Sequence, residues 1–323
     1  MTRRRTTDMR PMEIRMADPV KDLCARLRGR ADVLAPKDAE EPILAATVRG
    51  AIFGWLAELN ARDELAAVGI KPRASALLSG PPGCGKTTLA HHLAARLGVP
   101  LVIVGAEHLI ERGMGDSEQN VRRLFDVIES HDGPCVLLLD EIDALGSKRR
   151  DTGGDRGGAV GAMNSVLTVL LRRVEAFEGV LIGATNRADA LDAALWRRFG
   201  MQIEVALPDD ESRWAIIKRY GEPFDFGDDV LDALCDLTSG AAPSLLRQLM
   251  EGVKRALILG PRMRMDASDL ATTIAVVVEQ CKPHPDYDPP ALWAETRKSL
   301  GLLQKAATGQ PWPPTQNREK DAA

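Results

Sequence analysis

From Ala74 onward, short apolar runs alternate with longer segments whose apolar residues have helical spacing. The apolar runs are ASALLS, PLVIVG, PCVLLLD, GVLIGATN and MQIEVAL, and the segments between them include TTLAHHLAARLG, SEQNVRRLFDVIES and AVGAMNSVLTVLLRRVEAF. Continuous apolar strands are typical of a parallel sheet that helices cover on both faces. The alternation therefore predicts an α/β fold with three layers, in which helices wrap a parallel sheet.

The same pattern divides the chain into four parts. Residues 1–40 show little periodicity, so we expect a flexible arm with a short helix near VKDLCARL. Residues 41–207 carry the α/β pattern. Only helical patterns follow Pro208, which predicts a smaller helical domain over residues 208–281. Residues 282–323 are rich in proline and polar side chains, and we expect an extended, disordered tail with one short helix.

Composition narrows the class of protein. Hydrophobic residues make up 45% and charged residues 27% of the chain, as in soluble globular proteins. The net charge of -4 provides no overall positive field, so nucleic acid is not the expected partner. Five scattered cysteines without CxxC spacing argue against a zinc site or a disulfide framework and for a reducing compartment. No run approaches the roughly 20 apolar residues of a membrane span, so we expect no membrane association and a cytoplasmic location.

A glycine-rich segment lies between a predicted strand and a predicted helix. GPPGCGKTT, residues 80–88, fits G-x-x-x-x-G-K-[ST], in which backbone N–H groups surround phosphate oxygens at a helix N-terminus. Lys86 is predicted to reach the β and γ phosphates of ATP, and the Thr87 hydroxyl to bind Mg²⁺. A simple turn before a core helix is the alternative. The predicted phosphate-binding residues are Gly80, Pro81, Pro82, Gly83, Cys84, Gly85, Lys86, Thr87 and Thr88.

Two carboxylates follow the apolar run VLLLDEID. Asp140 is predicted to hold Mg²⁺ through water, and Glu141 to orient and polarise the water that attacks the nucleotide. An Asp-Glu pair can also cap a helix, but that explanation is weaker directly after a buried strand and downstream of a phosphate loop. The two motifs together predict nucleotide hydrolysis.

Six segments resemble the AAA+ ATPases, specifically the AAA clade that includes spastin, katanin and FtsH-like modules. They are GIKPRASALLSGPPGCGKTTLA, GDSEQNVRRLFD, VLLLDEIDAL, MNSVLTVLL, LIGATNRADALDAALWRRF and IEVALPDDESR, and they cover roughly residues 45–260 in the order of that family. The resemblance implies a P-loop NTPase fold with a C-terminal helical lid. It also implies a homo-oligomeric ring, usually a hexamer.

The resemblance also implies roles for residues outside the two motifs. Asn186 in GATNR looks like the sensor that holds the attacking water against the γ-phosphate. Arg197 and Arg198 in ALWRRF look like arginine fingers, which enter the ATP site of the neighbouring subunit. A guanidinium group neutralises the charge that develops on phosphoryl oxygens, so such residues make activity depend on a partner subunit.

Two segments depart from the family pattern, and a third, basic segment corresponds to one of its loops. Threading relatives carry an aromatic and an aliphatic residue in a pore loop, where this sequence has Gly113 and Met114. A second, basic loop over residues 146–161 matches another pore loop of the family, although a charge run of this kind is more often a solvated surface. In the lid, Ser244 stands where many relatives have arginine or alanine, and Arg247, one helical turn later, is expected to face solvent.

Three functions are compatible with these observations. The first is ATP hydrolysis by a ring that remodels or unfolds a protein, with recognition through a protein substrate or a separately encoded partner such as a protease. The second is a motor stimulated by nucleic acid, with the basic loop as the contact. The third is a nucleotide-dependent switch that gates a partner protein, which the missing pore-loop aromatic favours.

Overall fold

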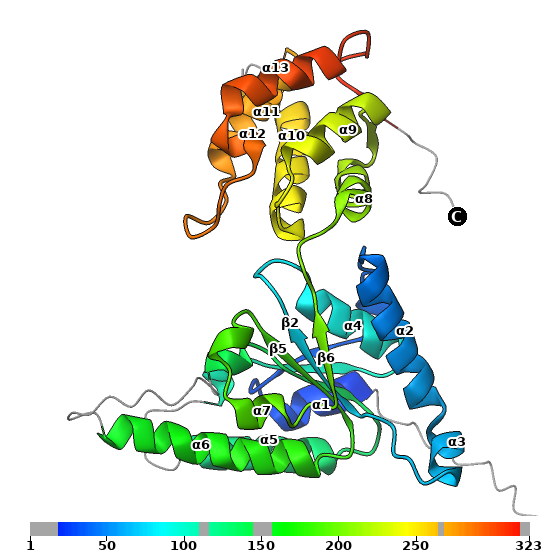
Figure 1. Ribbon diagram of the computed structural model, residues 1–323, viewed down its shortest axis with the longest axis vertical. Coiled ribbons are helices and arrows are strands. Elements are labelled where there is room, and N and C mark those ends of the chain that lie inside the picture. Colours follow the sequence, from blue (N-terminus) through cyan, green and yellow to red (C-terminus); the bar gives the residue numbers. More distant parts are fainter. Residues whose placement is uncertain (1–18, 110–115, 145–156, 264–267, 317–323) are drawn as a thin grey trace, which may run out of the picture.

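Six strands form the central sheet, in the order β1-β3-β4-β5-β2-β6 (Figure 1). The computed structural model describes residues 19–109, 116–144, 157–263 and 268–316. All neighbouring strands are parallel except β1 and β3, which are antiparallel. The strands are β1 (Asp32–Leu34), β2 (Ser75–Ser79), β3 (Leu101–Val104), β4 (Val136–Leu139), β5 (Val180–Thr185) and β6 (Met201–Glu204). The α/β fold with a largely parallel sheet is therefore confirmed.

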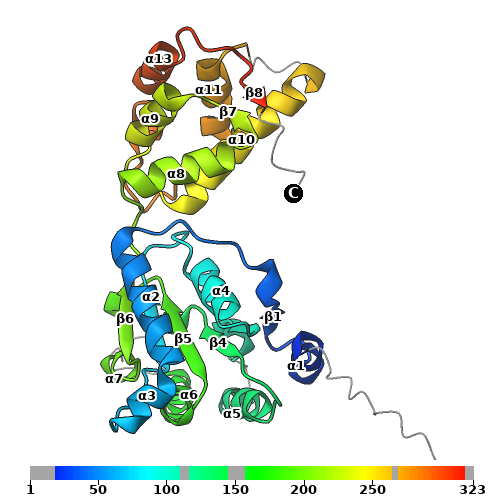
Figure 2. The ribbon, with the colours of Figure 1, turned by 90° about the vertical axis from the view of Figure 1, so that its right-hand side faces the viewer.

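Helices cover both faces of this sheet, as the continuous apolar strands require. Figure 2 shows α2 and α4 on one side of the sheet and α5 and α6 on the other. Successive strand residues point to opposite faces, so Leu77 lies in the core under α5 and α6, whereas Leu78 lies in the core under α2 and α4. The helices of this part are α1 (Pro19–Leu27), α2 (Ala46–Asn60), α3 (Arg62–Ala67), α4 (Lys86–Arg96), α5 (Asp116–Glu129), α6 (Gly157–Ala176) and α7 (Ala193–Trp196), with short 3-10 turns η1 (Pro36–Asp38), η2 (Ala106–His108), η3 (Ile142–Ala144) and η4 (Ala188–Ala190).

A second, helical body follows β6 and has its own hydrophobic core. Its first helix starts where the carboxylate of Asp209 accepts a hydrogen bond from the Ser212 N–H at 2.9 Å, an N-cap that ends the extended segment after β6. Its elements are α8 (Asp210–Gly221), β7 (Phe224–Asp225), α9 (Asp228–Leu237), α10 (Pro243–Met263), α11 (Leu270–Gln280), α12 (Ala291–Ala294), α13 (Thr296–Ala306) and β8 (Thr315–Gln316). Among the helices of the described residues, none has the length and apolar character that a bilayer crossing requires.

The short helix expected near VKDLCARL is present as α1, but the described part of residues 1–40 is packed on the sheet domain rather than a flexible arm. Helix α1 buries Leu23 and Leu27 in the same core as Phe125 of α5, and β1 extends the sheet by pairing Val33 with Val102. A three-residue strand is too short to show a period, and its partner strand lies far along the chain. Local pattern therefore could not identify it.

The expectation of an extended tail over residues 282–323 also needs correction. Leu292 of α12 and Leu303 of α13 are completely buried in the core of the helical body. The short strand β8 then pairs with β7, with Phe224 opposite Gln316. Proline-rich composition marked the 282–290 segment correctly as non-helical, but it gave no information about the packing of the helices that follow.

Helix α1 offers a test with two adjacent residues. Leu23→Ala removes a fully buried side chain, so we expect the free energy of unfolding to fall by about 2–5 kcal/mol. Cys24→Ala changes an exposed side chain on the same helix and should stay within about 0.5 kcal/mol of the parent. Urea denaturation of the full chain measures both. Equal effects of the two substitutions would mean that α1 does not pack on this core.

Candidate functional site

Three loops meet at the carboxyl ends of neighbouring parallel strands. Ser79 ends β2, Thr185 ends β5, and these two residues are paired across the sheet. The glycine-rich loop leaves β2, Asn186 follows β5, and Asp140 follows β4, the next strand along. Since such ends lie at one edge of the sheet, segments that are far apart in sequence come together there.

The glycine-rich loop forms a turn that opens onto the start of α4. Gly83 and Gly85 have φ angles of 78° and 86°, in the left-handed region that glycine adopts without a steric penalty. Gly85 is the residue before α4, which begins at Lys86. The first N–H groups of α4 have no carbonyl partner within the helix, so they and the partial positive charge of the helix end form an anion site.

Lys86 brings a buried positive charge into this site. Its side chain lies in the loop with 7% of the residue exposed, and Nζ donates to the carbonyls of Gly80 at 2.8 Å and Pro81 at 3.0 Å. Nζ also donates to Oδ1 of Asn186 at 2.6 Å. Burial lowers the pKa of Lys86, while the nearby thiol and carboxylates, including Asp140, act in the opposite direction. Three acceptors compensate for the loss of water around the ammonium group.

The carboxylates lie beside the first turn of α4. The Thr87 hydroxyl donates to Oδ2 of Asp140 at 2.9 Å, and the other oxygen of Asp140 accepts from the N–H of Glu141 at 2.9 Å. Glu141 has a φ of 52°, which is unusual for a residue with a side chain and marks a sharp turn directly after β4. Glu141 is exposed and lines the cavity described next.

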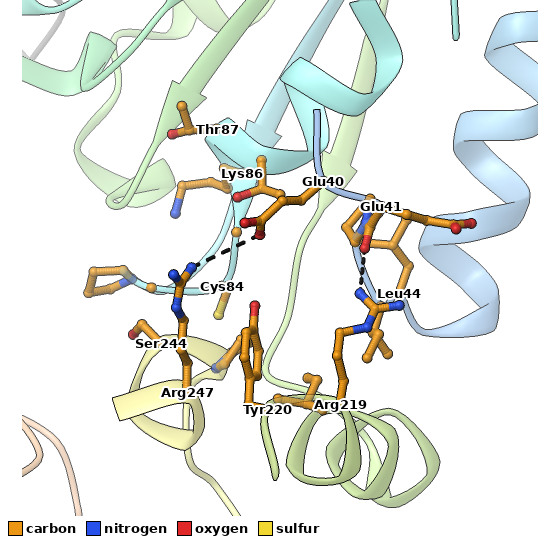
Figure 3. A pocket seen from close by; sticks show the side chains of 18 of the residues that line it. Glu40, Glu41, Leu44, Cys84, Lys86, Thr87, Arg219, Tyr220, Ser244 and Arg247 are labelled. Carbon is orange, nitrogen blue, oxygen red and sulfur yellow. Dashed lines mark hydrogen bonds and ion pairs between the residues drawn. The ribbon is translucent and has the colours of Figure 1, made fainter. Parts of the chain in front are cut away.

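A cavity of about 470 Å³ lies above the loop, between the sheet edge and the helical body (Figure 3). The floor is polar and the opposite wall is mixed, with apolar side chains from both bodies. The floor consists of Pro82, Gly83, Cys84, Gly85, Lys86, Thr87, Thr88, Asp140, Glu141 and Asn186, and the wall includes Glu40, Glu41, Ile43, Leu44, Ile216, Arg219, Tyr220, Ser244 and Arg247.

Arg247 is exposed, as expected, but it also has a place in the site that was not predicted. Its side chain is 49% exposed and lines the cavity, where it lies 5.3 Å over the Tyr220 ring and 4.0 Å from the carboxylate of Glu40 (Figure 3). Helix α10 points its N-terminus at the loop, so Ser244 and the residue one turn later share the face toward the cavity. Arg247 reaches the cavity because of where the whole of α10 lies. The spacing of residues in the sequence does not predict that position.

The segment before α2 was also missed as part of the site. The guanidinium of Arg219 donates to the backbone carbonyl of Glu41 at 2.5 Å, which joins this segment to the helical body. Ile43 and Leu44 turn apolar side chains toward the cavity. No motif marks the segment. The only available signal was the apolar pair IL within a polar and proline-containing stretch.

The helical body also bonds directly to the glycine-rich loop. The N–H of Ser244, in the first turn of α10, donates to the carbonyl of Gly83 at 3.1 Å. A Cβ atom at Gly83 would lie 2.1 Å from the Ser244 hydroxyl oxygen, so only glycine fits this approach. The loop conformation and the position of the helical body therefore depend on each other.

Cys84 lies in the same loop with its side chain buried. Burial raises the pKa of the thiol, and the positive charge of Lys86 opposes that rise to a smaller extent. The thiol is therefore neutral around pH 7 and contributes no negative charge to a site that is shaped for anions.

Some predicted site residues lie elsewhere. Arg197 and Arg198 follow α7, are exposed, and do not line the cavity of their own chain. Arg198 forms an ion pair with Glu175 at 3.2 Å, whereas Arg197 has no ion pair within the described part of the chain. Gly113 and Met114 lie outside the described residues, as does the basic part of the second loop, Lys148, Arg149, Arg150 and Arg156.

The fold and the site define a P-loop nucleotide-binding protein. The family model for the ATPase family associated with various cellular activities (AAA) matches residues 76–207, which run from β2 to the end of the sheet. This matched part of the chain, residues 76–207, belongs to the AAA ATPase family.

Curated relatives match over much of the chain. A proteasome-activating nucleotidase of Thermococcus gammatolerans is 34% identical over 233 residues, which are 67% of this chain and 57% of that protein. The ATP-dependent zinc metalloprotease FTSH 2 of Oryza sativa subsp. japonica is 36% identical over 64% of this chain and 31% of that protein. A nuclear valosin-containing protein-like protein of Mus musculus is 40% identical over 49% of this chain and 20% of that protein. The chain thus spans less than two thirds of the length of these relatives.

A solved structure supports the fold. The crystal structure of the FIGL-1 AAA domain matches with a TM-score of 0.63 at 23% identity, over 89% of this chain and 94% of that one. At this level of identity the similarity concerns the fold alone, including the presence of both the sheet and the helical body.

Gly83 allows a test of the bond between loop and lid. Gly83→Ala should weaken nucleotide binding by about tenfold or more, equivalent to roughly 1.4 kcal/mol, because the new methyl group displaces Ser244. Gly98→Ala is the matched control, since Gly98 also has a positive φ, 72°, but has no atom within 4 Å of an added Cβ. Calorimetric titration with ADP measures both. Equal nucleotide affinity in the two variants would exclude a steric role of this contact.

Proposed function

We propose that this chain binds ATP with Mg²⁺ and hydrolyses the β–γ bond. One observation carries the proposal: the ends of β2, β4 and β5 bring Lys86, the Asp140-Glu141 pair and Asn186 around a single cavity. Phosphoryl transfer to water needs a positive charge at a helix N-terminus, which Lys86 supplies. It also needs two carboxylates and an amide close by.

Each residue has a proposed role that follows from its contacts. Lys86 exchanges its bonds to backbone carbonyls for phosphate oxygens, which compensate for its buried charge more completely than carbonyls do. Glu141, which no described cation neutralises, orients the attacking water and accepts its proton. Asn186 donates from its amide nitrogen to the γ-phosphate or the water, while its oxygen stays on Lys86.

The residues present fit Mg²⁺. The Thr87 hydroxyl and the Asp140 carboxylate are hard oxygen ligands that already lie side by side. Within the described ranges no group of three or more His, Cys, Asp or Glu side chains could hold a metal by itself, which agrees with an ion held partly by nucleotide phosphates and water. When bound, the ion neutralises charge on the β and γ phosphates.

The apolar wall supports a purine base as the other end of the ligand. Ile43 and Leu44 from the segment before α2 line the same cavity as Ile216 and Tyr220 of α8. A flat, apolar base fits between such side chains, and burying it would draw the helical body toward the sheet. Nucleotide occupancy would then set the angle between the two bodies.

We further propose that the active form is a cytoplasmic homo-oligomeric ring, most simply a hexamer, in which Arg197 acts on the site of the neighbouring subunit. Arg197 is exposed, lies away from its own cavity and lacks an ion pair within the described part of the chain, whereas Glu175 holds Arg198. In this proposal Arg197 is the arginine available to a neighbouring subunit, and Arg198 holds the turn after α7 through Glu175.

Hydrolysis in this proposal drives the remodelling of a protein. The relatives named as a proteasome-activating nucleotidase and as an ATP-dependent zinc metalloprotease support a protein substrate, and a separately encoded protease as a partner. The contact that grips the substrate is proposed for the Gly113-Met114 loop, which is outside the described residues.

Glu141→Gln and Lys86→Ala test the assignment of hydrolysis. Glu141→Gln should retain ATP affinity and lose about 10²-fold or more in kcat, because the amide cannot take the proton from water. Lys86→Ala should lose ATP binding, since it removes the charge that faces the phosphates. Phosphate release and nucleotide titration measure the two steps. Full turnover by Glu141→Gln would refute the role of this carboxylate.

Mixing experiments test the action of Arg197 between subunits. Arg197→Ala alone should reduce kcat by about 10³-fold or more, in the range of known arginine fingers. Mixed with Lys86→Ala subunits, it should recover activity, because intact sites then face intact arginines. Arg197→Lys is the control that keeps the charge without the planar fork. An unchanged, low rate in the mixture would mean that the arginine acts within its own chain.

A further inference from the structure

Thr185 is a buried residue that ties together the three segments of the site. It is the last residue of β5 and is 1% exposed. Its hydroxyl donates to Oδ1 of Asp143 at 2.7 Å and accepts from the N–H of Arg187 at 3.0 Å. Its backbone carbonyl accepts from the N–H of Gly80 at 3.3 Å. One residue thus contacts the loop after β4, the loop after β5 and the start of the phosphate loop.

The direction of these bonds is fixed by chemistry. A backbone N–H can only donate and a carboxylate can only accept, so the single hydroxyl proton must point at Asp143. The hydroxyl is buried and Asp143 is half-buried, and either neighbour would be left without this partner if the hydroxyl were lost. The chain from Asp143 through Thr185 to the amide of Arg187 is therefore a rigid connection.

Asn186 lies between the two tied positions. Its neighbour Thr185 is fixed by the sheet, and the next amide is fixed by the Thr185 hydroxyl. The Asn186 side chain spans the site to Lys86 at 2.6 Å. On the other side, Asp143 belongs to the η3 turn two residues after Glu141, and the Ala144 N–H donates to the Glu141 carbonyl at 2.9 Å. The connection therefore sets the separation between Asn186 and Glu141.

We propose that Thr185 and Asp143 are positioning residues that hold Asn186 and Glu141 at the distance that ATP hydrolysis requires. Neither side chain lines the cavity, so neither contacts the nucleotide. This inference rests on the proposed function. It predicts a defect in the chemical step rather than in nucleotide binding, because Lys86 and the N–H groups of the loop remain in place.

Thr185→Val is the first test, since valine has the same shape without the hydroxyl. We expect kcat to fall by roughly ten- to a hundredfold with the dissociation constant of ATP changed by less than about threefold. Thr185→Ser is the matched control because it keeps the hydroxyl and loses a methyl group. The kcat of Thr185→Ser should stay within about threefold of the parent. This should hold even if the melting temperature of Thr185→Ser falls as far as that of Thr185→Val.

Asp143 gives an independent test that does not alter a buried position. Asp143→Ala removes the acceptor and should lower kcat to the level of Thr185→Val, whereas Asp143→Asn keeps an acceptor oxygen and should retain most of the activity. In the double variant, Thr185→Val with Asp143→Ala, the two losses should not multiply, because each breaks the same bond. If Thr185→Val does not fold, the comparison of Asp143→Ala with Asp143→Asn tests the positioning role by itself.

The outcomes separate this inference from the proposed function. A parent protein with no ATP turnover, or with turnover that survives Glu141→Gln, would refute the proposed hydrolysis. A parent that hydrolyses ATP through Glu141 while Thr185→Val and Asp143→Ala keep full kcat would refute the positioning role only. Losses that multiply in the double variant, or an equal loss in Thr185→Ser, would also refute it.

Discussion

The buried ammonium group of Lys86 is the constraint on which the site depends. A charge with so little exposure is tolerated only when several acceptors surround it, and local helix geometry supplies none of them. The acceptors come from the loop itself, at Gly80 and Pro81, and from Asn186 a hundred residues later. The parallel sheet is what brings these segments together, since it places the ends of β2 and β5 side by side. A phosphate would satisfy the same charge, so the arrangement that stabilises this loop also suits an anion.

The same loop connects the two bodies of the molecule. The first turn of α10 bonds to the Gly83 carbonyl, and Arg219 of α8 bonds to the segment before α2. These contacts lie around the cavity rather than at a distant hinge. The glycine-rich loop is therefore bonded directly to the helical body. The covalent link between the bodies is short, from the end of β6 at Glu204 to the start of α8 at Asp210.

The features that sequence could predict are those encoded in contiguous residues. The strands from β2 to β5 are mostly apolar runs, and the phosphate loop and the Asp140-Glu141 pair are local motifs. Both the fold class and the floor of the cavity therefore followed from patterns of a few residues. The errors concern contacts between distant segments. The edge strand β1 has three residues, the helices α12 and α13 are amphipathic without a marked partner, and Arg247 reaches the cavity only because α10 points at the loop. Thr185 was not predicted as a site residue because its hydroxyl can bond to Asp143 only when β4 and β5 are neighbours in the sheet.

The turn at Glu141 sets the balance of charge in the site. A positive φ at a residue with a side chain costs free energy, which the bond from its N–H to Asp140 and the burial of Ile142 offset. The result is a carboxylate that lines the cavity with its neighbour Asp140, while the buried ammonium group of Lys86 is already shared among three acceptors. Adding the phosphates of a nucleotide would increase the negative charge further. Within the described residues two arginines line the cavity: Arg219 donates to the Glu41 carbonyl, and Arg247 pairs with Glu251 and lies next to Glu40. In the proposed ring, the exposed Arg197 of a neighbouring copy would add a further guanidinium group beside the phosphates.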